Sequence, residues 1–152
     1  GALKRCYPGA KFINIYRNPY TVVMSTINMF TKEMGLFCLN EPASHQVIED
    51  VTIDLFERIY KKAFRELDAM PPEDHIDIRY EDFCKDPEGY VKQMYDHLGI
   101  DGFEKAKPYF DAYLESQKNY KKNKFELTPE LRDKINAKLG FYFERYGYEM
   151  QK

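Results

Sequence analysis

One short segment near the start of the chain constrains its fold more than any other: a strand-like run that turns directly into a helix start. The run Phe12–Tyr16 is rich in aromatic and β-branched residues and has the length of a buried strand. Asn18 then stands where a helix N-cap belongs, and Pro19 fits the first helical position because that position needs no N–H donor. Arg17 lies between the two elements. A guanidinium at the carboxyl end of a strand, beside a helix N-terminus, predicts a site for a phosphate or sulfate group.

The size and composition of the chain indicate one globular domain over residues 1–152. An apolar fraction of 43% and an aromatic fraction of 16% are typical of a folded protein and not of a disordered one. The net charge of −2 predicts no binding to nucleic acid. No apolar run approaches the roughly 20 residues of a membrane span. Cys6, Cys38 and Cys84 lack metal-ligand spacing, and we expect them to be reduced core thiols of a cytoplasmic protein.

The spacing of apolar residues predicts two parallel strands joined by helices. Residues 11–17 and 76–80 have strand patterns, and neither segment has a hairpin partner close by. A parallel pairing through helical crossovers is therefore expected, in an α/β fold. Because two strands make a poor sheet alone, we expect the chain to be the C-terminal half of a larger domain whose other strands lie upstream.

Helix signals fill most of the remaining sequence. Helices are expected from Pro19 to the low thirties with Gly35 as the stop, from about Ser44 to Pro71, over 87–98 and 103–116, and from Pro129 through Leu139. On the second of these helices, the apolar face is expected to be formed by Ile48, Val51, Leu55, Ile59 and Ala63. The segments 36–44 and 117–124 are expected to be loops.

Arg17 and Ser25 are the first candidates for ligand binding. Ser25 lies about two turns into the first helix, and its side chain leans back towards the N-terminus of that helix. Both groups are then placed to contact one anion above the end of the strand. The alternative is structural: Arg17 pairs with a carboxylate, and Ser25 bonds to the backbone of its own helix.

Four segments together resemble the sulfotransferase superfamily, whose members use 3′-phosphoadenosine 5′-phosphosulfate (PAPS) as the sulfuryl donor. The first runs from Ala10 to Ser25, with Asn18 where the family pattern has Asp. The second is the segment 78–87, which is similar to the family's Tyr-Glu-Asp strand end. Shorter similarities follow at 98–100 and 119–131, so that the resemblance covers about residues 4–149.

The resemblance implies a partial P-loop-type, three-layer α/β domain with a nucleotide-binding site. Arg17 and Ser25 would bind the 3′-phosphate, and Tyr80 would lie near the adenine. Lys121 and Lys122 would approach the 3′-phosphate from a basic loop. For Tyr80 the alternative is a core tyrosine at a strand end. For the two lysines the alternative is a solvated charge run.

The donor loop and the catalytic base of the family have no match in this sequence. Family members hold the 5′-phosphosulfate with a glycine- and serine-containing loop after their first strand, and their general base also lies upstream of the Arg…Ser segment. No such loop precedes Lys11. His45, His75 and His97 are expected at surface or capping positions. We therefore assign no catalytic residue and expect the 152 residues alone to be inactive in sulfuryl transfer.

The sequence thus predicts a sulfotransferase-like protein. The intact enzyme would transfer a sulfuryl group from PAPS to a hydroxyl or amine acceptor, and this chain would supply the half that binds the 3′-phosphate. The expected partners are the nucleotide co-substrate and the acceptor, with no metal. Two alternatives stay open. One is a nucleotide or small-molecule kinase relative, which needs a Walker-type loop and Mg²⁺ ligands, and the other is a non-enzymatic helical interaction module.

Overall fold

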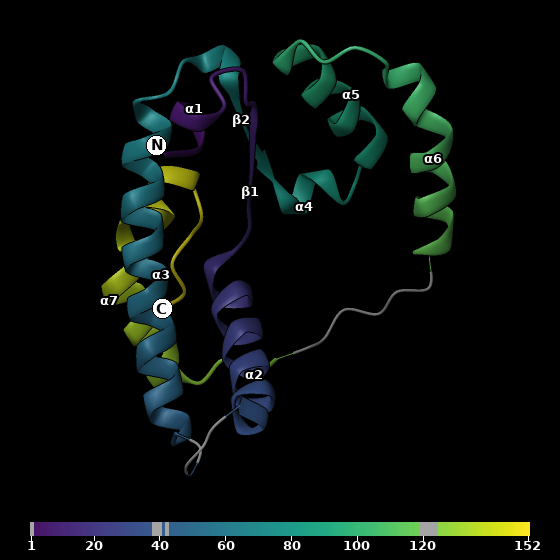
Figure 1. Ribbon diagram of the computed structural model, residues 1–152. Helices are drawn as coiled ribbons and strands as arrows, with labels where there is room; N and C mark the ends of the chain where they lie inside the picture. The colour runs from purple at the N-terminus through teal and green to yellow at the C-terminus, as the bar shows by residue number, and fades with distance from the viewer. Residues whose placement is uncertain (1, 38–40, 42, 119–124) are drawn as a thin grey trace. The chain divides into compact units, whose positions relative to one another are not determined.

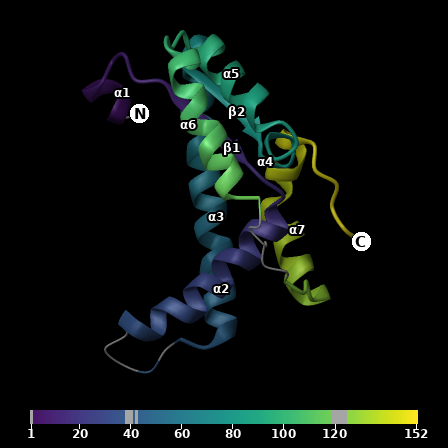
Figure 2. The same cartoon turned by 90° about the vertical axis from the view of Figure 1, so that its right-hand side faces the viewer.

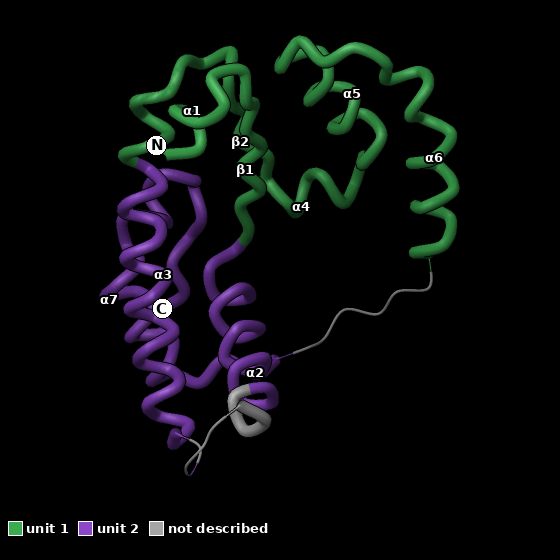
Figure 3. The backbone as a smooth tube through the Cα atoms, viewed as in Figure 1, with its two compact units in different colours: residues 1–17, 65–122 green, residues 18–64, 123–152 purple. Residues whose placement is uncertain are grey.

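The computed structural model describes residues 2–37, 41, 43–118 and 125–152. The elements are, in chain order, α1 (Ala2–Cys6), β1 (Phe12–Tyr16), α2 (Pro19–Phe37), α3 (His45–Asp68), the 3₁₀ turn η1 (Pro72–Asp74), β2 (His75–Arg79), α4 (Tyr80–Phe83), α5 (Pro87–Leu98), α6 (Phe103–Ser116) and α7 (Pro129–Tyr146) (Figure 1). They form two compact units (Figure 3). The first unit is Gly1–Arg17 with Arg65–Lys122, and the second is Asn18–Phe64 with Asn123–Lys152.

The first unit is built on a two-stranded parallel sheet, which confirms the predicted strands. β1 pairs with β2 in a register that places Ile13 beside Ile76 and Ile15 beside Ile78. Ile76 and Ile78 form a core cluster with two residues of α5. The prediction that β1 is buried is wrong for its isoleucines, since Ile13 and Ile15 are 46% and 50% exposed. The core cluster of this unit forms between β2 and α5 and does not include them.

A helical hairpin follows the sheet in the first unit. The Asp86 carboxylate caps α5 by accepting a hydrogen bond at 3.0 Å from a backbone N–H of its first turn. Gly99 ends α5 with a φ of 63°, in the left-handed region that glycine enters without strain. α6 then runs back along α5 (Figure 1, Figure 2). The Tyr95 ring packs edge-on against Phe103 at a centroid distance of 5.6 Å. Both predicted helices are confirmed, and Pro108 lies inside α6 without dividing it.

The second unit is held together by rings and apolar side chains of α2, α3 and α7. Tyr142 on α7 is 1% exposed, and its ring lies 4.5 Å from Tyr60 of α3 and 4.9 Å from Tyr146, measured between centroids. Thr128 caps α7 by accepting a hydrogen bond from the Leu131 N–H at 3.3 Å. The predicted start of α7 is therefore confirmed.

Three expectations about helices and thiols need correction. α2 continues through Gly35 to Phe37, because a glycine costs only about 1 kcal/mol inside a helix and does not by itself end one. On α3 the predicted apolar face is wrong at three positions: Val51, Leu55 and Ile59 are exposed. The buried side chains of this helix in the second unit are those of Ile48, Thr52, Ile53 and Phe64. Cys6 and Cys84 are exposed and do not belong to the core, and Cys38 lies outside the described residues.

A pair of lysines ties the first residues of the chain to the turn before β2. The Asp74 carboxylate lies 2.7 Å from Lys4 Nζ and 2.9 Å from Lys11 Nζ. Lys4 also donates to the Ala10 carbonyl at 3.0 Å, and Lys11 donates to the Glu73 carbonyl at the same distance. Hydrogen bonds from Lys4 and then Lys11 hold the pKa of Asp74 below its usual 3.8. The helix α1, which the sequence did not predict, is thereby joined to the sheet region.

This contact predicts a pH dependence of stability. Because the pKa of Asp74 is lower in the folded protein, the stabilisation is present above pH 3.8 and is lost as the pH falls through the folded-state value. Urea unfolding at pH 7 and pH 3 should therefore show a smaller loss of stability in Asp74→Asn than in the wild type. Asp101→Asn, at an exposed aspartate between α5 and α6, is the control and should behave like the wild type. An equal pH dependence in Asp74→Asn and the wild type would contradict the assignment.

Candidate functional site

The carboxyl ends of β1 and β2 bring together two of the predicted site residues. The last pair in the strand register is Tyr16 with Arg79. Arg17 directly follows β1, and Tyr80 directly follows β2. The Arg17 guanidinium carbon lies 4.5 Å from the centroid of the Tyr80 ring. Both side chains are half-buried. A cation over an aromatic face at this distance is an attractive contact that fixes both groups.

The groups around this strand end include a phenol and two carboxylates that are each paired with a cation. Burial raises the pKa of the Tyr16 phenol above its usual 10.0, so that its neutral form is favoured. The Glu81 carboxylate lies 3.7 Å from the Arg79 Nε. A hydrogen bond from Lys85 at 2.7 Å lowers the pKa of the Asp82 carboxyl. Glu81 is therefore an ion-pair partner of Arg79. Asp82 also lies in an ion pair, which does not favour acid–base work.

The helix start after Arg17 is built as the sequence predicts. The Asn18 side-chain oxygen accepts hydrogen bonds from the N–H groups of Tyr20 at 3.0 Å and Thr21 at 3.4 Å, which is N-cap geometry. Arg17 ends the first of the two chain segments that form the first unit, whereas Ser25 is half-buried on α2 in the second unit. Their contact with one anion stays a prediction. Lys121 and Lys122 lie outside the described residues.

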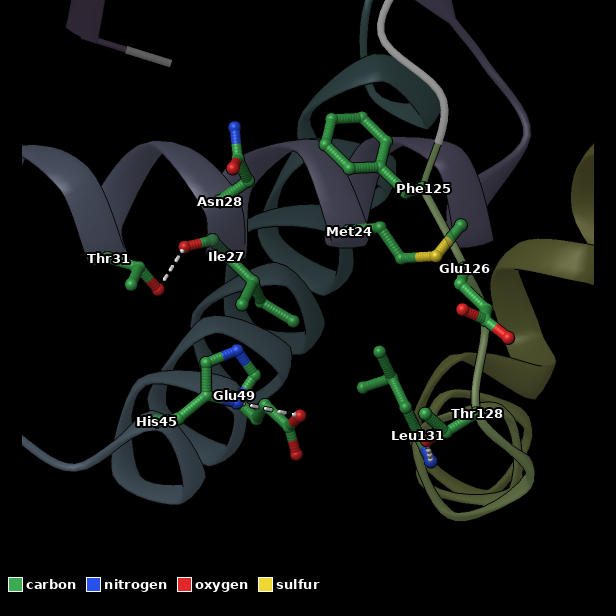
Figure 4. Close-up of a pocket in the computed structure, with 10 residues that line it drawn as sticks. All are labelled: Met24, Ile27, Asn28, Thr31, His45, Glu49, Phe125, Glu126, Thr128 and Leu131. Carbon is green, nitrogen blue, oxygen red and sulfur yellow. Dashed lines mark hydrogen bonds and ion pairs between the residues drawn. The ribbon is translucent and has the colours of Figure 1, made fainter.

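A cavity of about 260 Å³ with both polar and apolar lining residues lies in the second unit (Figure 4). Met24 and Asn28 of α2 line this cavity. Ser25 lies on the same helix but is not one of the lining residues. His45 and Glu49 face the cavity from α3, with 3.2 Å between the imidazole Nδ1 and the carboxylate. The expectation that His45 lies at the surface is confirmed, because its side chain is 64% exposed. Sequence reasoning did not find this cavity, since its walls come from segments far apart in the chain.

The other two histidines have structural contacts. The His97 ring Nε2 lies 2.9 Å from the Pro72 carbonyl and 2.9 Å from the His75 carbonyl, so it links the end of α5 to the start of β2.

Among the described residues, no group of three or more Cys, His, Asp and Glu side chains is arranged to hold a metal ion. None of the described helices has the length and apolar character needed to cross a membrane.

Comparison with known proteins assigns the family. The model of the sulfotransferase family matches residues 1–105, and the chain belongs to that family. Two relatives, from Mycobacterium bovis and Mycobacterium tuberculosis, are omega-hydroxy-beta-dihydromenaquinone-9 sulfotransferases, each 33% identical to the chain over 147 residues. These matches cover 97% of this chain and 38% of each relative, so the chain spans well under half the length of these curated relatives. No solved structure matches the chain.

Proposed function

We propose that this chain provides the 3′-phosphate-binding part of a PAPS-dependent sulfotransferase. The observation that carries the proposal is the stacking of Arg17 on Tyr80 at the carboxyl ends of the two parallel strands. The two residues come from separate sequence motifs, and both motifs resemble nucleotide-binding segments of the family. Ligands of open α/β sheets bind at this edge, which supports a nucleotide site there.

The chemistry of the two residues suits a phosphorylated nucleoside. The planar guanidinium carries its N–H groups in one plane, where they can bind a phosphate in a bidentate manner. In the proposed site, the Tyr80 ring would contact the adenine. α2 begins two residues after Arg17, and the partial positive charge of its N-terminus favours an anion. In the proposed site, the Ser25 hydroxyl donates one further hydrogen bond to the 3′-phosphate.

The proposed reaction of the intact enzyme is an in-line sulfuryl transfer. The acceptor oxygen forms a bond to sulfur while the bond between sulfur and the bridging phosphate oxygen breaks. The acceptor proton passes to a general base for which we assign no residue of this chain, and adenosine 3′,5′-bisphosphate leaves. Both relatives are named for a hydroxylated menaquinone derivative. For this chain we therefore propose an alcohol as the acceptor class, with the residues described here acting by positioning the donor.

A nucleotide titration tests the proposal. Adenosine 3′,5′-bisphosphate should bind the chain at least about tenfold more tightly than adenosine 5′-monophosphate, because only the former carries the 3′-phosphate. Chemical-shift changes in NMR spectra measure both affinities, even in the millimolar range. Ser25→Ala should lose about 1 kcal/mol of the binding free energy of the bisphosphate, the value of one hydrogen bond.

Two outcomes would contradict the proposal. Equal binding of the two nucleotides would remove the 3′-phosphate site. Preferential binding of ATP with magnesium would favour the kinase alternative instead. A Ser25→Ala variant with unchanged affinity would remove Ser25 from the site but would leave Arg17 in it.

A further inference from the structure

The first unit contains a cavity of about 460 Å³ beside α4 and the helical hairpin of α5 and α6. Phe83 contributes from α4, Val91 from α5, and Phe103, Phe110 and Leu114 from α6. We propose that this cavity binds the isoprenoid or alkyl chain of a lipophilic acceptor alcohol. That the ligand is a sulfuryl acceptor rests on the proposed function. That the cavity binds an apolar chain is argued from its lining residues alone.

The lining selects an uncharged, apolar ligand. Its two charged side chains, Glu88 and Lys107, lie 2.9 Å apart and neutralise each other. Lys107 Nζ also contacts the Asp111 carboxylate at 3.1 Å. The other lining residues are aromatic or aliphatic. A phosphate or a sugar would leave its polar groups without partners on such walls, whereas a hydrocarbon chain gains free energy from burial.

The hairpin gives the cavity a fixed frame. At the closed end of the hairpin, the ring of Tyr95 packs on Phe103 and on Phe110, at centroid distances of 5.6 and 6.4 Å. Near the start of α5, the ion pair between Glu88 and Lys107 joins the two helices again. The apolar space is therefore bounded by contacts of the hairpin itself, and its volume lies in the range of small-molecule sites.

The cavity opens to solvent beside two tyrosines. Tyr109 and Tyr113 line it, yet they are 79% and 63% exposed. Their rings present apolar faces and hydroxyl groups that water can reach, which suits a ligand with an apolar chain and a polar end. A hydroxylated isoprenoid has this composition. The apolar chain of such an acceptor would be anchored in the cavity, and its hydroxyl end would stay outside the apolar walls.

Titration of the full chain with farnesol, an isoprenoid alcohol, tests the inference. Farnesol should bind and shift the NMR ring signals of Tyr109 and Tyr113, and sorbitol should do neither. Leu114→Asp places a carboxylate in the apolar wall and should weaken farnesol binding at least tenfold. Leu55→Asp is the matched control, because Leu55 is an exposed leucine on α3 in the other unit, and it should bind farnesol like the wild type. Val91→Phe fills part of the cavity without adding charge and should also weaken binding at least tenfold.

The outcomes separate this inference from the proposed function. Binding of adenosine 3′,5′-bisphosphate without binding of farnesol would overturn the cavity inference and leave the nucleotide site standing. Binding of farnesol without a preference for the 3′-phosphate would support the cavity and contradict the proposed function. Farnesol binding that is equal in the wild type, Leu114→Asp and Val91→Phe would overturn the inference. Unchanged Tyr109 and Tyr113 signals would also overturn it. That second result would favour a polypeptide segment as the ligand that covers the cavity. If Leu114→Asp fails to fold by circular dichroism, Val91→Phe decides the test.

Discussion

Ile135→Ala should lower the free energy of unfolding of the second unit by about 2–5 kcal/mol. Ile135 lies on α7 and is fully buried. Truncation to Ala removes three carbons from a packed interior, so the protein loses both the transfer free energy and the contacts around the resulting cavity. Urea unfolding followed by circular dichroism measures the change. A loss of this size is a large fraction of the stability of an ordinary domain.

Ile59→Ala is the matched control for this prediction. It is the same substitution in a helix of the same unit, but the Ile59 side chain is 51% exposed. We expect a change within about 0.5 kcal/mol, because little surface is removed from the interior and Ala has the higher helix propensity. Comparable losses in the two variants would mean that Ile59 is also covered, and that the observed assignment of the faces of α3 is wrong.

The backbone order of the fold could be predicted from local signals. Proline at a first helical position, preceded by an Asn, Asp or Thr cap, marks the starts of α2, α5 and α7. The parallel pairing followed from two strand patterns without a hairpin turn. The cap and proline signals lie next to each helix start and the strand patterns lie within each strand, so the sequence alone was sufficient to identify these elements.

The faces of α3 could not be predicted in this way, because the helix has apolar residues on more than one side. One set contains Val51, Leu55 and Ile59, and another contains Tyr60 and Phe64. Both sets fit a helical period. The second is chosen by contacts distant in sequence, such as that between Tyr60 and Tyr142 of α7. Periodicity identifies a helix but does not decide between two apolar faces.

Short elements could not be predicted for the same reason, because they depend on contacts with residues that are distant in sequence. α1 has five residues, and Asp74 contacts both Lys4 within it and Lys11 after it. The segment after β2 forms the short helix α4, although its Tyr-Glu-Asp sequence was expected to end a strand. In the candidate site, local pattern predicted the positions of Arg17 and Tyr80 at strand ends. Their direct stacking follows from the register between β1 and β2, which is a property of the folded chain.

Arg17→Ala should weaken the binding of adenosine 3′,5′-bisphosphate by about 2–3 kcal/mol, a loss of about 30- to 150-fold in affinity. The guanidinium can form two parallel charge-assisted hydrogen bonds to a phosphate, and its stacking on Tyr80 holds it in place. Arg17→Lys should restore only part of the affinity, because an ammonium group cannot reproduce the planar fork. Calorimetry or NMR titration measures all three proteins.

Two controls separate loss of a phosphate contact from a general defect. Adenosine 5′-monophosphate lacks the 3′-phosphate and should bind the wild type and Arg17→Ala almost equally. Arg58→Ala removes an exposed arginine of α3 and should leave both affinities unchanged. If Arg17→Ala weakens the two nucleotides by the same factor, the role of Arg17 is to support Tyr80 and the strand end. The 3′-phosphate must then be bound elsewhere, because only a group that contacts this phosphate can distinguish the two nucleotides.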